Sequence, residues 1–445
     1  MSEAMIINRQ IAELRPSTSN ARTHSDKQIG QIADSILAFS FVNPVIVDEE
    51  DQILCGHGRV RAAQKLGWTE VPTLRVEHLS DARKRAFVIA ENRLAELAGW
   101  DEDLLAVEFQ HLLDAAVDFE VTATGFETAE IDLIIGALGL DEDDSDSVEE
   151  CLPEVGLTAV TRLGDLWNIG SHRLLCGDAL VPENYVELVN GELAQMVFTD
   201  PPYNVPIVGH VSGLGATVHR EFIMASGEMS EAEYTRFLST FCRHLASTTI
   251  DGSVHFICID WRHSRELLRA GQIAYDKLLN LCVWAKSAGG MGALYRSQHE
   301  LVFVFKSGSA PHINNVMLGK HGRNRTNVWT YPSLNSFQAK REDTLPMHPT
   351  VKPVGLVADA ILDCSARGQI VLDPFLGSGT TILAAHRTGR KCYGMELDPL
   401  YVDVALRRLR RVTGIEPVCG RAGTAFSERE RQVGDGPLIP APEVC

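Results

Sequence analysis

The sequence predicts an α/β protein of more than one domain, and three observations carry this expectation. Apolar runs typical of buried strands alternate with helical patterns, as in a sheet covered by helices. Segment 370–387 adds a strand that passes through a Gly-x-Gly turn into a helix, a pattern typical of cofactor loops. At 445 residues the chain is also too long for one ordinary domain.

The composition limits the class of protein and its surroundings. Hydrophobic residues make up 45% of the chain and charged residues 22%, as in globular proteins. The first residues lack a signal-peptide pattern, no apolar stretch approaches the roughly 20 residues of a membrane span, and the cysteines form no Cys-x-x-Cys pair. We therefore expect a cytoplasmic protein with no membrane contact, no metal site and no disulfide framework.

The formal net charge of −18 argues at first sight against binding to nucleic acid. Its distribution weakens that objection, because the acidic residues concentrate at 141–150 and the balance becomes basic between 306 and 352. A basic island on an acidic protein still meets phosphates. Charge alone leaves the question open.

The pattern of residues 1–115 predicts a small α+β domain. Apolar spacing indicates a helix at 26–36, strands at 44–48 and 71–76, and a helix that follows the turn Gly56-His57-Gly58-Arg59. From residue 80 to about 137 the pattern is helical. We expect residues 116–160, which include the acidic block, to form a helical and acidic linker.

Three segments of this domain resemble the ParB/sulfiredoxin-like family: Asn43–Val47, Gly56–Ala63 and Glu91–Arg93. The resemblance implies that the glycine–arginine turn holds phosphates. Arg59 and Arg61 are therefore candidates for contact with DNA phosphates, with a structural role as the alternative. Sulfiredoxins carry a catalytic cysteine inside this turn, whereas Cys55 precedes it here, so redox repair is disfavoured. Whether the domain binds nucleotide or DNA stays open.

A second domain is predicted at 161–415, followed by a disordered tail at 416–445. Its central feature is the segment Thr199–Asn204, Thr-Asp-Pro-Pro-Tyr-Asn, after an apolar run. Because proline cannot donate to a strand ladder, the strand must end at Asp200 and a stiff loop must follow. A carboxylate, rigid carbonyls and a flat ring suit a planar heterocycle that bears an amino group.

The second feature of this domain is a loop and an acid that suit a nucleoside. Glycines in the loop Asp373–Thr381 let the backbone approach a ligand at the amino end of a helix. Glu396 ends the next strand, where a carboxylate accepts hydrogen bonds from ribose hydroxyls; a surface acid is the alternative. The single Gly-x-Gly and the lack of a Gly-x-x-x-x-Gly-Lys pattern favour a nucleoside without a pyrophosphate over ATP or NAD.

Residues 161–413 resemble the β-class DNA amino-methyltransferases, which use S-adenosylmethionine to methylate an exocyclic nitrogen of adenine or cytosine. Four motifs carry the resemblance, in the order that defines the class: Thr199–Asn204, His348–Pro353, Asp373–Thr381 and Gly394–Tyr401. It implies a three-layer Rossmann-like methyltransferase fold beside the smaller ParB-like domain. It also implies the following cofactor-binding residues: Asp178, Lys352, Asp373, Phe375, Gly377, Ser378, Gly379, Thr380, Glu396 and Asp398.

The predicted catalytic residues are Asp200, Pro201, Pro202 and Tyr203. The lone pair of the adenine amino group is conjugated into the ring, so this nitrogen is a poor nucleophile. The Asp200 carboxylate and the Pro201 carbonyl can each accept one N–H, which frees the lone pair for direct attack on a sulfonium methyl. Tyr203 offers a stacking face for a base flipped out of the duplex.

Recognition of the DNA sequence is expected from the basic island at 307–346. Four side chains there are of the types that read guanine and adenine edges: Arg323, Asn324, Arg325 and Asn327. A basic loop that touches only phosphates is the alternative for each of them. Loop 204–229 is expected to close over the flipped base.

We therefore predict methyl transfer from S-adenosylmethionine to N6 of adenine in double-stranded DNA. Cytosine N4 is the alternative within the class, since the same geometry serves both amines, although an initial Asp rather than Ser favours adenine. A ParB-like DNA-binding protein with an inactive methyltransferase half is the alternative of another class. The sequence leaves open the recognition site, the formation of a homodimer and a partner restriction nuclease.

Overall fold

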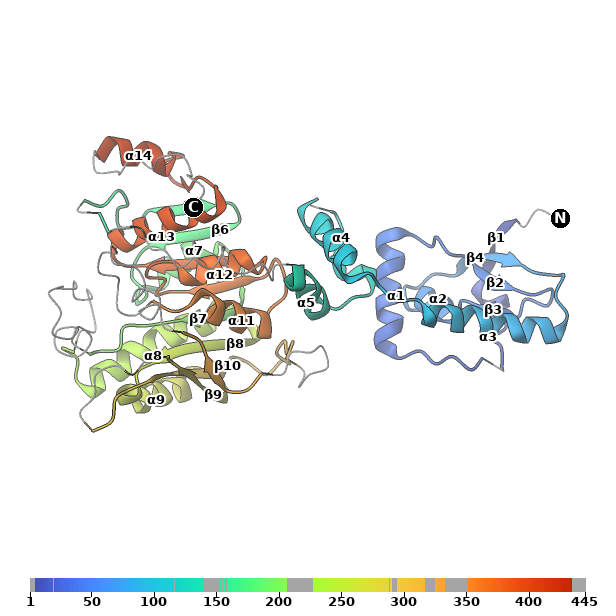
Figure 1. Ribbon diagram of the computed structural model, residues 1–445, viewed down its shortest axis with the longest axis horizontal. Coiled ribbons are helices and arrows are strands. Elements are labelled where there is room, and N and C mark those ends of the chain that lie inside the picture. Colours follow the sequence, from blue (N-terminus) through green and yellow to red (C-terminus); the bar gives the residue numbers. More distant parts are fainter. Residues whose placement is uncertain are drawn as a thin grey trace. The chain divides into compact units, whose positions relative to one another are not determined.

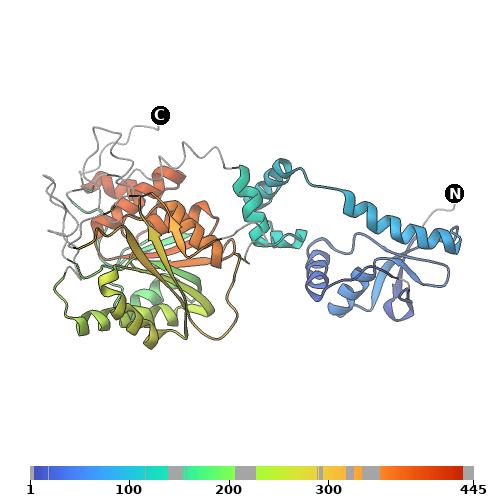
Figure 2. The ribbon, with the colours of Figure 1, turned by 60° about the horizontal axis from the view of Figure 1, so that its bottom comes forward.

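The structure is a computed structural model of the 445-residue chain. It describes residues 5–18, 20–115, 117–138, 153, 155–156, 158–205, 227–287, 289, 294–316, 325–332 and 351–433. The chain divides into two compact units, Met1–Leu140 and Asp141–Cys445, and each is described by itself (Figures 1 and 2). Within the described residues, no helix is long and apolar enough to cross a membrane.

The N-terminal unit contains a four-stranded sheet in the order β1-β4-β2-β3. Its strands are β1 (Ile6–Gln10), β2 (Val45–Val47), β3 (Ile53–Cys55) and β4 (Glu70–Arg75). Its helices are α1 (Asp26–Phe39), α2 (His57–Lys65), α3 (Asp81–Leu97), α4 (Glu102–Asp114) and α5 (Thr128–Leu138), with 3-10 turns η1 (Ile11–Glu13) and η2 (Val121–Thr124). The strands and helices expected in the first hundred residues are confirmed.

This unit extends beyond the boundary predicted at residue 115. Phe126 packs edge-on against Phe109 and Trp100, with ring centroids 5.1 Å and 5.5 Å apart. Gln31 on α1 donates to the Gly125 carbonyl at 3.0 Å. Part of the predicted linker, residues 117–138, is therefore packed into the unit. Its few aromatic residues pack against distant aromatic residues, and the charge of the segment, on which the prediction of a linker was based, does not reveal these contacts.

The C-terminal unit is built on a ten-stranded sheet in the order β11-β9-β10-β8-β7-β12-β13-β6-β5-β14. Its strands are β5 (Leu166–Ile169), β6 (His172–Cys176), β7 (Ala194–Thr199), β8 (Thr249–Ile259), β9 (Lys277–Ala285), β10 (His299–Lys306), β11 (Val328–Thr330), β12 (Ile370–Asp373), β13 (Lys391–Glu396) and β14 (Val418–Cys419). The central strands β8, β7, β12, β13 and β6 run parallel, and β10 and β5 flank them antiparallel.

The order of these strands creates a topological switch point. The chain passes from β7 outward to β8, and from β12 outward in the opposite direction to β13. Strands β7 and β12 are nevertheless neighbours in the sheet. Open α/β sheets bind ligands in the crevice at the carboxyl ends of such a pair.

Helices cover both faces of this sheet, which gives the predicted three-layer α/β fold (Figures 1 and 2). One layer holds α7 (Pro182–Val189), α8 (Glu231–Ser247) and α9 (Ser264–Ala274), with the 3-10 turn η3 (Trp261–His263) before α9. The other holds α11 (Val354–Cys364), α12 (Thr380–Arg387) and α13 (Pro399–Thr413). Alternation along β7 supplies both cores, since Met196 and Phe198 pack with α11 and α12 while Val197 packs with α8.

The prediction of a disordered tail from residue 416 onward is wrong for residues 416–433. These residues form β14 and α14 (Phe426–Val433). Phe426 is fully buried and its ring lies 5.3 Å from that of Trp167, while Glu430 pairs with Arg407 and Arg410. The charges that suggested disorder have partners on α13. Residues 434–445, the acidic block 141–150 and most of loop 204–229 lie outside the described residues.

Candidate active site

The two predicted loops lie side by side at the carboxyl ends of β7 and β12. Thr199, the last residue of β7, donates its hydroxyl to Asp373 Oδ1 at 2.8 Å. Thr381, at the start of α12, donates to the other carboxylate oxygen of Asp373 at 2.6 Å. The Asp373 carboxylate therefore ties the Asp-Pro-Pro-Tyr loop to the glycine loop.

Asp200 belongs to a cluster of charged side chains. The Lys352 ammonium contacts Asp200 Oδ2, lies 2.8 Å from Glu300 Oε2 and donates to the Tyr203 hydroxyl at 3.1 Å. The Tyr203 hydroxyl donates to Asp200 Oδ1, and Lys286 pairs with Glu300 Oε1. The side chain of Asp200 is 23% exposed, against 4% for Lys352 and 8% for Glu300.

Burial and charge act against each other in this cluster. Burial raises the pKa of Asp200 and the charge of Glu300 raises it further, against the lowering effect of Lys352. For Glu300 burial also acts to raise the pKa, but the ammonium groups of Lys352 and Lys286 outweigh burial and lower the pKa to about 2. The Lys352 pKa is raised, because its two carboxylate partners outweigh its burial. The site therefore holds alternating charges that stabilise one another.

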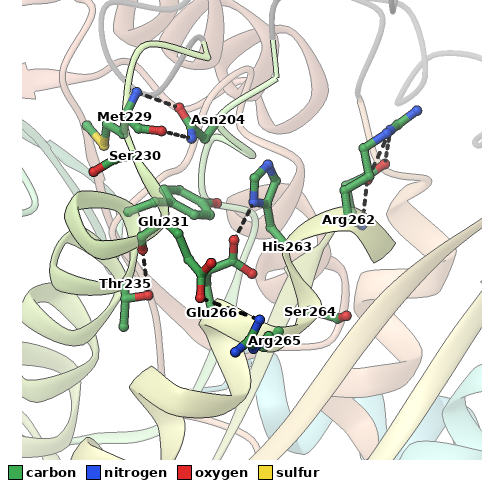
Figure 3. Close-up of polar contacts among 12 residues, drawn as sticks. Asn204, Met229, Ser230, Glu231, Thr235, Arg262, His263, Ser264, Arg265 and Glu266 are labelled. Atoms are coloured by element: carbon green, nitrogen blue, oxygen red, sulfur yellow. Dashed lines mark hydrogen bonds and ion pairs between the residues drawn. The ribbon is translucent and has the colours of Figure 1, made fainter.

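The rest of the loop has a structural role that the motif did not specify. The Pro202 carbonyl accepts a hydrogen bond from the Tyr234 hydroxyl at 2.9 Å. Asn204 has a left-handed backbone, with φ of 54°, and its side-chain oxygen accepts from the Gly227 and Met229 amides. Its side-chain nitrogen donates to the Met229 carbonyl at 2.8 Å (Figure 3). The loop is thus held to the amino end of α8.

The amino end of α8 is capped in its first turn, and Figure 3 shows a further polar contact at the start of α9. Ser230 and Glu233 form a capping box at the start of α8. His263 Nδ1 lies 3.0 Å from Glu266 Oε1, at the start of α9. The Asp-Pro-Pro-Tyr loop is thus held, through Tyr234 and Asn204, to a capped helix.

The glycine loop leaves its backbone open to a ligand. Gly377 and Gly379 have φ of 55° and 89°, a region that favours glycine. Among the described atoms, none lies within 4 Å of a Cβ built on Gly377, whereas one on Gly379 would lie 3.0 Å from Ala405 Cβ. Space for a ligand therefore lies over Gly377, and Gly379 lets α12 pack closely on α13.

Two carboxylates border this space. Glu396 ends β13, and its oxygens accept the amides of Gly377 and Asp398, both at 2.9 Å. Burial raises the pKa of Glu396 to about 7, although the two amide hydrogen bonds lower it. Asp178 follows the neighbouring strand β6, and its Oδ1 accepts the Leu180 amide at 2.8 Å. Such carboxylates suit the hydroxyl and amino donors of a nucleoside, so the site fits the predicted cofactor.

The other predicted cofactor residues contact the protein itself. The Phe375 ring packs against Phe241 on α8, at 5.0 Å between centroids. Arg408 donates to the Ser378 carbonyl and to the Thr380 hydroxyl, both at 3.3 Å. Asp398 caps α13. Lys352 lies at Asp200 and not at the glycine loop, and contact of these residues with a cofactor stays a prediction.

The described residues among those predicted to contact DNA also have partners within the chain. Arg325 pairs with Asp359 and lies 2.9 Å from Asp363, both on α11. Asn327 donates to the Leu281 carbonyl at 3.1 Å. These contacts favour structural roles, and contact with DNA stays a prediction. Arg323 and Asn324 lie outside the described residues.

In the N-terminal unit, Arg59, one of the two predicted phosphate ligands, lines a small cavity. Arg59 donates to the Pro44 carbonyl at 3.2 Å, and Arg61 to the His24 carbonyl at 3.3 Å. Arg59 and Glu91 line a cavity of about 210 Å³ next to the turn. A carboxylate therefore stands beside the guanidinium in this cavity, and binding of phosphate there stays a prediction.

The motifs missed three residues of the site: Glu300, Lys286 and Tyr234. Glu300 is the second residue of β10 and directly precedes the apolar run 301–305, and it pairs in register with Trp284 on β9. A carboxylate in such a strand was a signal for a buried partner. Lys286 directly follows β9, and no local pattern predicts where its side chain points.

Comparisons with known proteins find similar proteins for both the N-terminal and the C-terminal part of the chain. Residues 194–407 match the N6/N4 DNA methylase family, residues 103–163 the ParB-methyltransferase HTH domain and residues 2–93 the ParB N-terminal domain. The ParB-like nuclease domain-containing protein YnaK of Escherichia coli is 44% identical over 86 residues, which are 19% of this chain and 99% of YnaK.

Two further proteins are similar to the C-terminal half. The type II methyltransferase M2.MboI of Moraxella bovis is 27% identical over 236 residues, which cover 49% of this chain and 82% of M2.MboI. The crystal structure of the M1.HpyAVI–SAM complex has 19% identity and a TM-score of 0.39, over 53% of this chain and 98% of the other. The chain belongs to the ParB-like family through its N-terminal domain, and a ParB-methyltransferase HTH domain and a DNA methylase domain of the N6/N4 family follow it.

Proposed function

We propose that this protein transfers a methyl group from S-adenosylmethionine to N6 of adenine in double-stranded DNA, with the target base flipped out of the duplex. DNA is the substrate expected of a DNA methylase joined to ParB-like domains. The observation that carries the proposal is the hydrogen bond from Thr199 to Asp373, which sets Asp200 beside the glycine loop. An acceptor for an amino group and a space for a nucleoside thus adjoin at the switch point of the sheet.

In this proposal the protein orients an amine. The cofactor supplies an electrophilic methyl group on a positively charged sulfur. Asp200 accepts one N–H of the base and the Pro201 carbonyl accepts the other, so that the lone pair leaves conjugation and points at the methyl. The Pro202 carbonyl is engaged by Tyr234, which supports the division of roles between the two prolines. Tyr203 faces the base, with its hydroxyl held by Asp200.

Glu396 and Asp178 hold the cofactor in this proposal. Glu396 accepts the ribose hydroxyls, because its carboxylate stands at the end of β13 beside the Gly377 backbone. Asp178, at the end of β6, accepts the amino group of the cofactor's adenine. The backbone over Gly377 lets the ligand approach closely.

Mass spectrometry of nucleosides tests the proposal. Duplex DNA of mixed sequence is incubated with the protein and S-adenosylmethionine that carries a deuterated methyl group, then digested. We expect labelled N6-methyladenine, with the rate reduced at least about 100-fold by Asp200→Ala, since that change removes an acceptor aligned with the reacting amine. Glu231→Ala, an exposed change on α8, is the matched control and keeps the rate.

Two results would change the conclusion. Labelled N4-methylcytosine as the sole product would assign the protein to the other amine, for which the same carboxylate geometry serves. Binding of S-adenosylmethionine without any labelled nucleoside would instead favour a DNA-binding protein whose methylase half is inactive. Sequencing of modified bases in DNA from cells that express the protein then gives the recognition site.

A further inference from the structure

The cluster behind Asp200 has a construction that the methylation motifs do not explain. Four side chains alternate in charge along the cluster, in the order Lys286, Glu300, Lys352 and Asp200, and the two in the middle are the buried ones. They come from the end of β9, from β10, from the segment before α11 and from the loop after β7. The sheet order places β10 two strands away from β7. A set drawn from four elements is a specific arrangement and not a local ion pair.

The contacts show which side chain of this cluster positions which of the others. Glu300 Oε2 lies 2.8 Å from the Lys352 ammonium and 3.2 Å from the Tyr203 hydroxyl, and its other oxygen pairs with Lys286. Both oxygens of Glu300 are therefore used to place neighbouring groups. The Lys352 ammonium also lies 5.7 Å from the centre of the Trp284 ring, over its face, which restricts the ammonium further.

Asp200 keeps acceptor capacity despite these contacts. Each carboxylate oxygen has about two acceptor sites, and Lys352 and Tyr203 occupy one on each oxygen. The side chain of Asp200 is 23% exposed, more than those of Lys352 and Glu300. The remaining acceptor sites are thus available on the side from which a base arrives.

We propose that Lys352 and Glu300 are positioning residues for Asp200. Glu300 anchors the Lys352 ammonium. The ammonium in turn keeps Asp200 ionised and oriented to accept an amino hydrogen. The inference rests on the proposed function, because it assigns Asp200 the role of acceptor. Neither residue needs to touch the base. Without the ammonium, Asp200 loses its cation but keeps the negative charge of Glu300 beside it, so protonation of Asp200 becomes more favourable.

The pH dependence follows from the groups that surround Asp200. Lys352 lowers its pKa and Glu300 raises it, while Asp373 on β12, with a pKa raised to about 6 by burial, adds a further negative charge. Cys258 on β8 has a pKa raised well above its usual value by burial, so it stays neutral. Removal of Lys352 therefore shifts the protonation of Asp200 to higher pH, and removal of the Glu300 charge shifts it to lower pH.

Methylation rates across pH 5–9 test the inference with Lys352→Met, Glu300→Gln and the double variant. We expect Lys352→Met to reduce kcat about 100-fold at neutral pH and to move the acid limb upward by at least about one pH unit. The kcat of the double variant should be about tenfold higher than that of Lys352→Met, because a neutral Gln no longer opposes the ionised Asp200. A structural role alone predicts that the double variant is the worst of the three.

Two more variants separate charge from packing. Lys352→Arg keeps the cation and should keep the acid limb of the wild-type protein, even if kcat falls. Lys306→Met removes a lysine at the other end of β10, where its ammonium donates to the Ser309 carbonyl, and should change neither quantity. Thermal melts and cofactor titrations of each variant confirm that the proteins are folded.

A measurement without DNA or cofactor keeps this inference separate from the proposed function. Infrared difference spectra between pH 5 and pH 9 report the protonated carboxyl band that is lost in Asp200→Asn. This band should persist to higher pH in Lys352→Met than in the wild-type protein. An unchanged band and an unchanged acid limb in Lys352→Met would overturn the inference, whereas absence of all methylation with a shifted band would contradict only the proposed function.

Discussion

At the scale of single residues, the site combines ionisable groups whose environments differ. Glu300 is held ionised by two ammonium groups, with a pKa of about 2, whereas burial raises the pKa of Glu396 to about 7. Both glutamates lie at the same edge of one sheet. The difference lies in their partners, since Glu300 faces cations and Glu396 faces backbone amides.

Cofactor binding should therefore depend on pH through Glu396. An ionised carboxylate accepts the ribose hydroxyls better than a carboxyl group, so the affinity should fall as the pH falls through about 7. We expect S-adenosylmethionine to bind about tenfold more weakly at pH 6 than at pH 8, as one unit below the pKa leaves about a tenth of the carboxylate ionised. Isothermal titration calorimetry at the two pH values measures this ratio.

Glu396→Gln is the control for that measurement. The amide keeps the shape of the side chain and removes its titration, so binding should weaken by about 10- to 100-fold at pH 8 and lose its dependence on pH. A wild-type affinity that is equal at pH 6 and pH 8 would show that ionisation of Glu396 has no part in binding.

At the scale of elements, the packing of α14 shows how a charged segment gains a fixed place. Phe426 inserts between α13 and β5, with Trp167 on one side and the guanidinium of Arg407 5.6 Å from its ring centre. Glu430 pairs with Arg407 and Arg410. The helix thus closes the edge of the sheet at β14 and β5.

Loss of the Phe426 ring should destabilise the C-terminal unit. Phe426→Ala removes a fully buried side chain and is expected to lower the free energy of unfolding by about 3–5 kcal/mol. Val433→Ala on the same helix removes an apolar side chain that is 37% exposed and should cost under about 0.5 kcal/mol. Urea unfolding followed by tryptophan fluorescence compares the two, and equal losses would mean that α14 does not contribute through Phe426.

At the scale of the whole molecule, the chain contains two units with separate cores. Val47, Ile53 and Val71 belong to the core of the N-terminal unit, while Ile361 and Leu383 belong to that of the C-terminal unit. The units also differ in their sheets, one of four strands and one of ten. Separate cores allow each unit to unfold by itself.

Calorimetry should resolve these two units. Ile53→Ala and Ile361→Ala each remove a buried side chain, at a cost of about 2–5 kcal/mol, and each should lower only one of two thermal transitions. S-adenosylmethionine should raise only the transition that Ile361→Ala lowers, because a ligand stabilises the unit that binds it. A single transition that responds to both substitutions would contradict independent unfolding.

The sequence by itself determined the elements that local chemistry dictates. Two prolines after Asp200 end β7, and the capping box at Ser230 starts α8. The glycines at 377 and 379 specify the turn into α12, because other residues rarely adopt its backbone angles. Motif order then predicted the class of fold and the cofactor, since both depend on contacts within short segments.

Only the tertiary structure decided which distant side chains meet. Glu300 and Lys286 join Asp200 because β10 lies between β9 and β8 in the sheet, and no local pattern encodes that order. Arg325 has a side chain of the type that reads DNA bases, yet it pairs with carboxylates on α11, which only the fold brings near. Charge and burial depend on neighbours in space, so the ionisation of Asp200 is a property of the folded sheet and not of its motif.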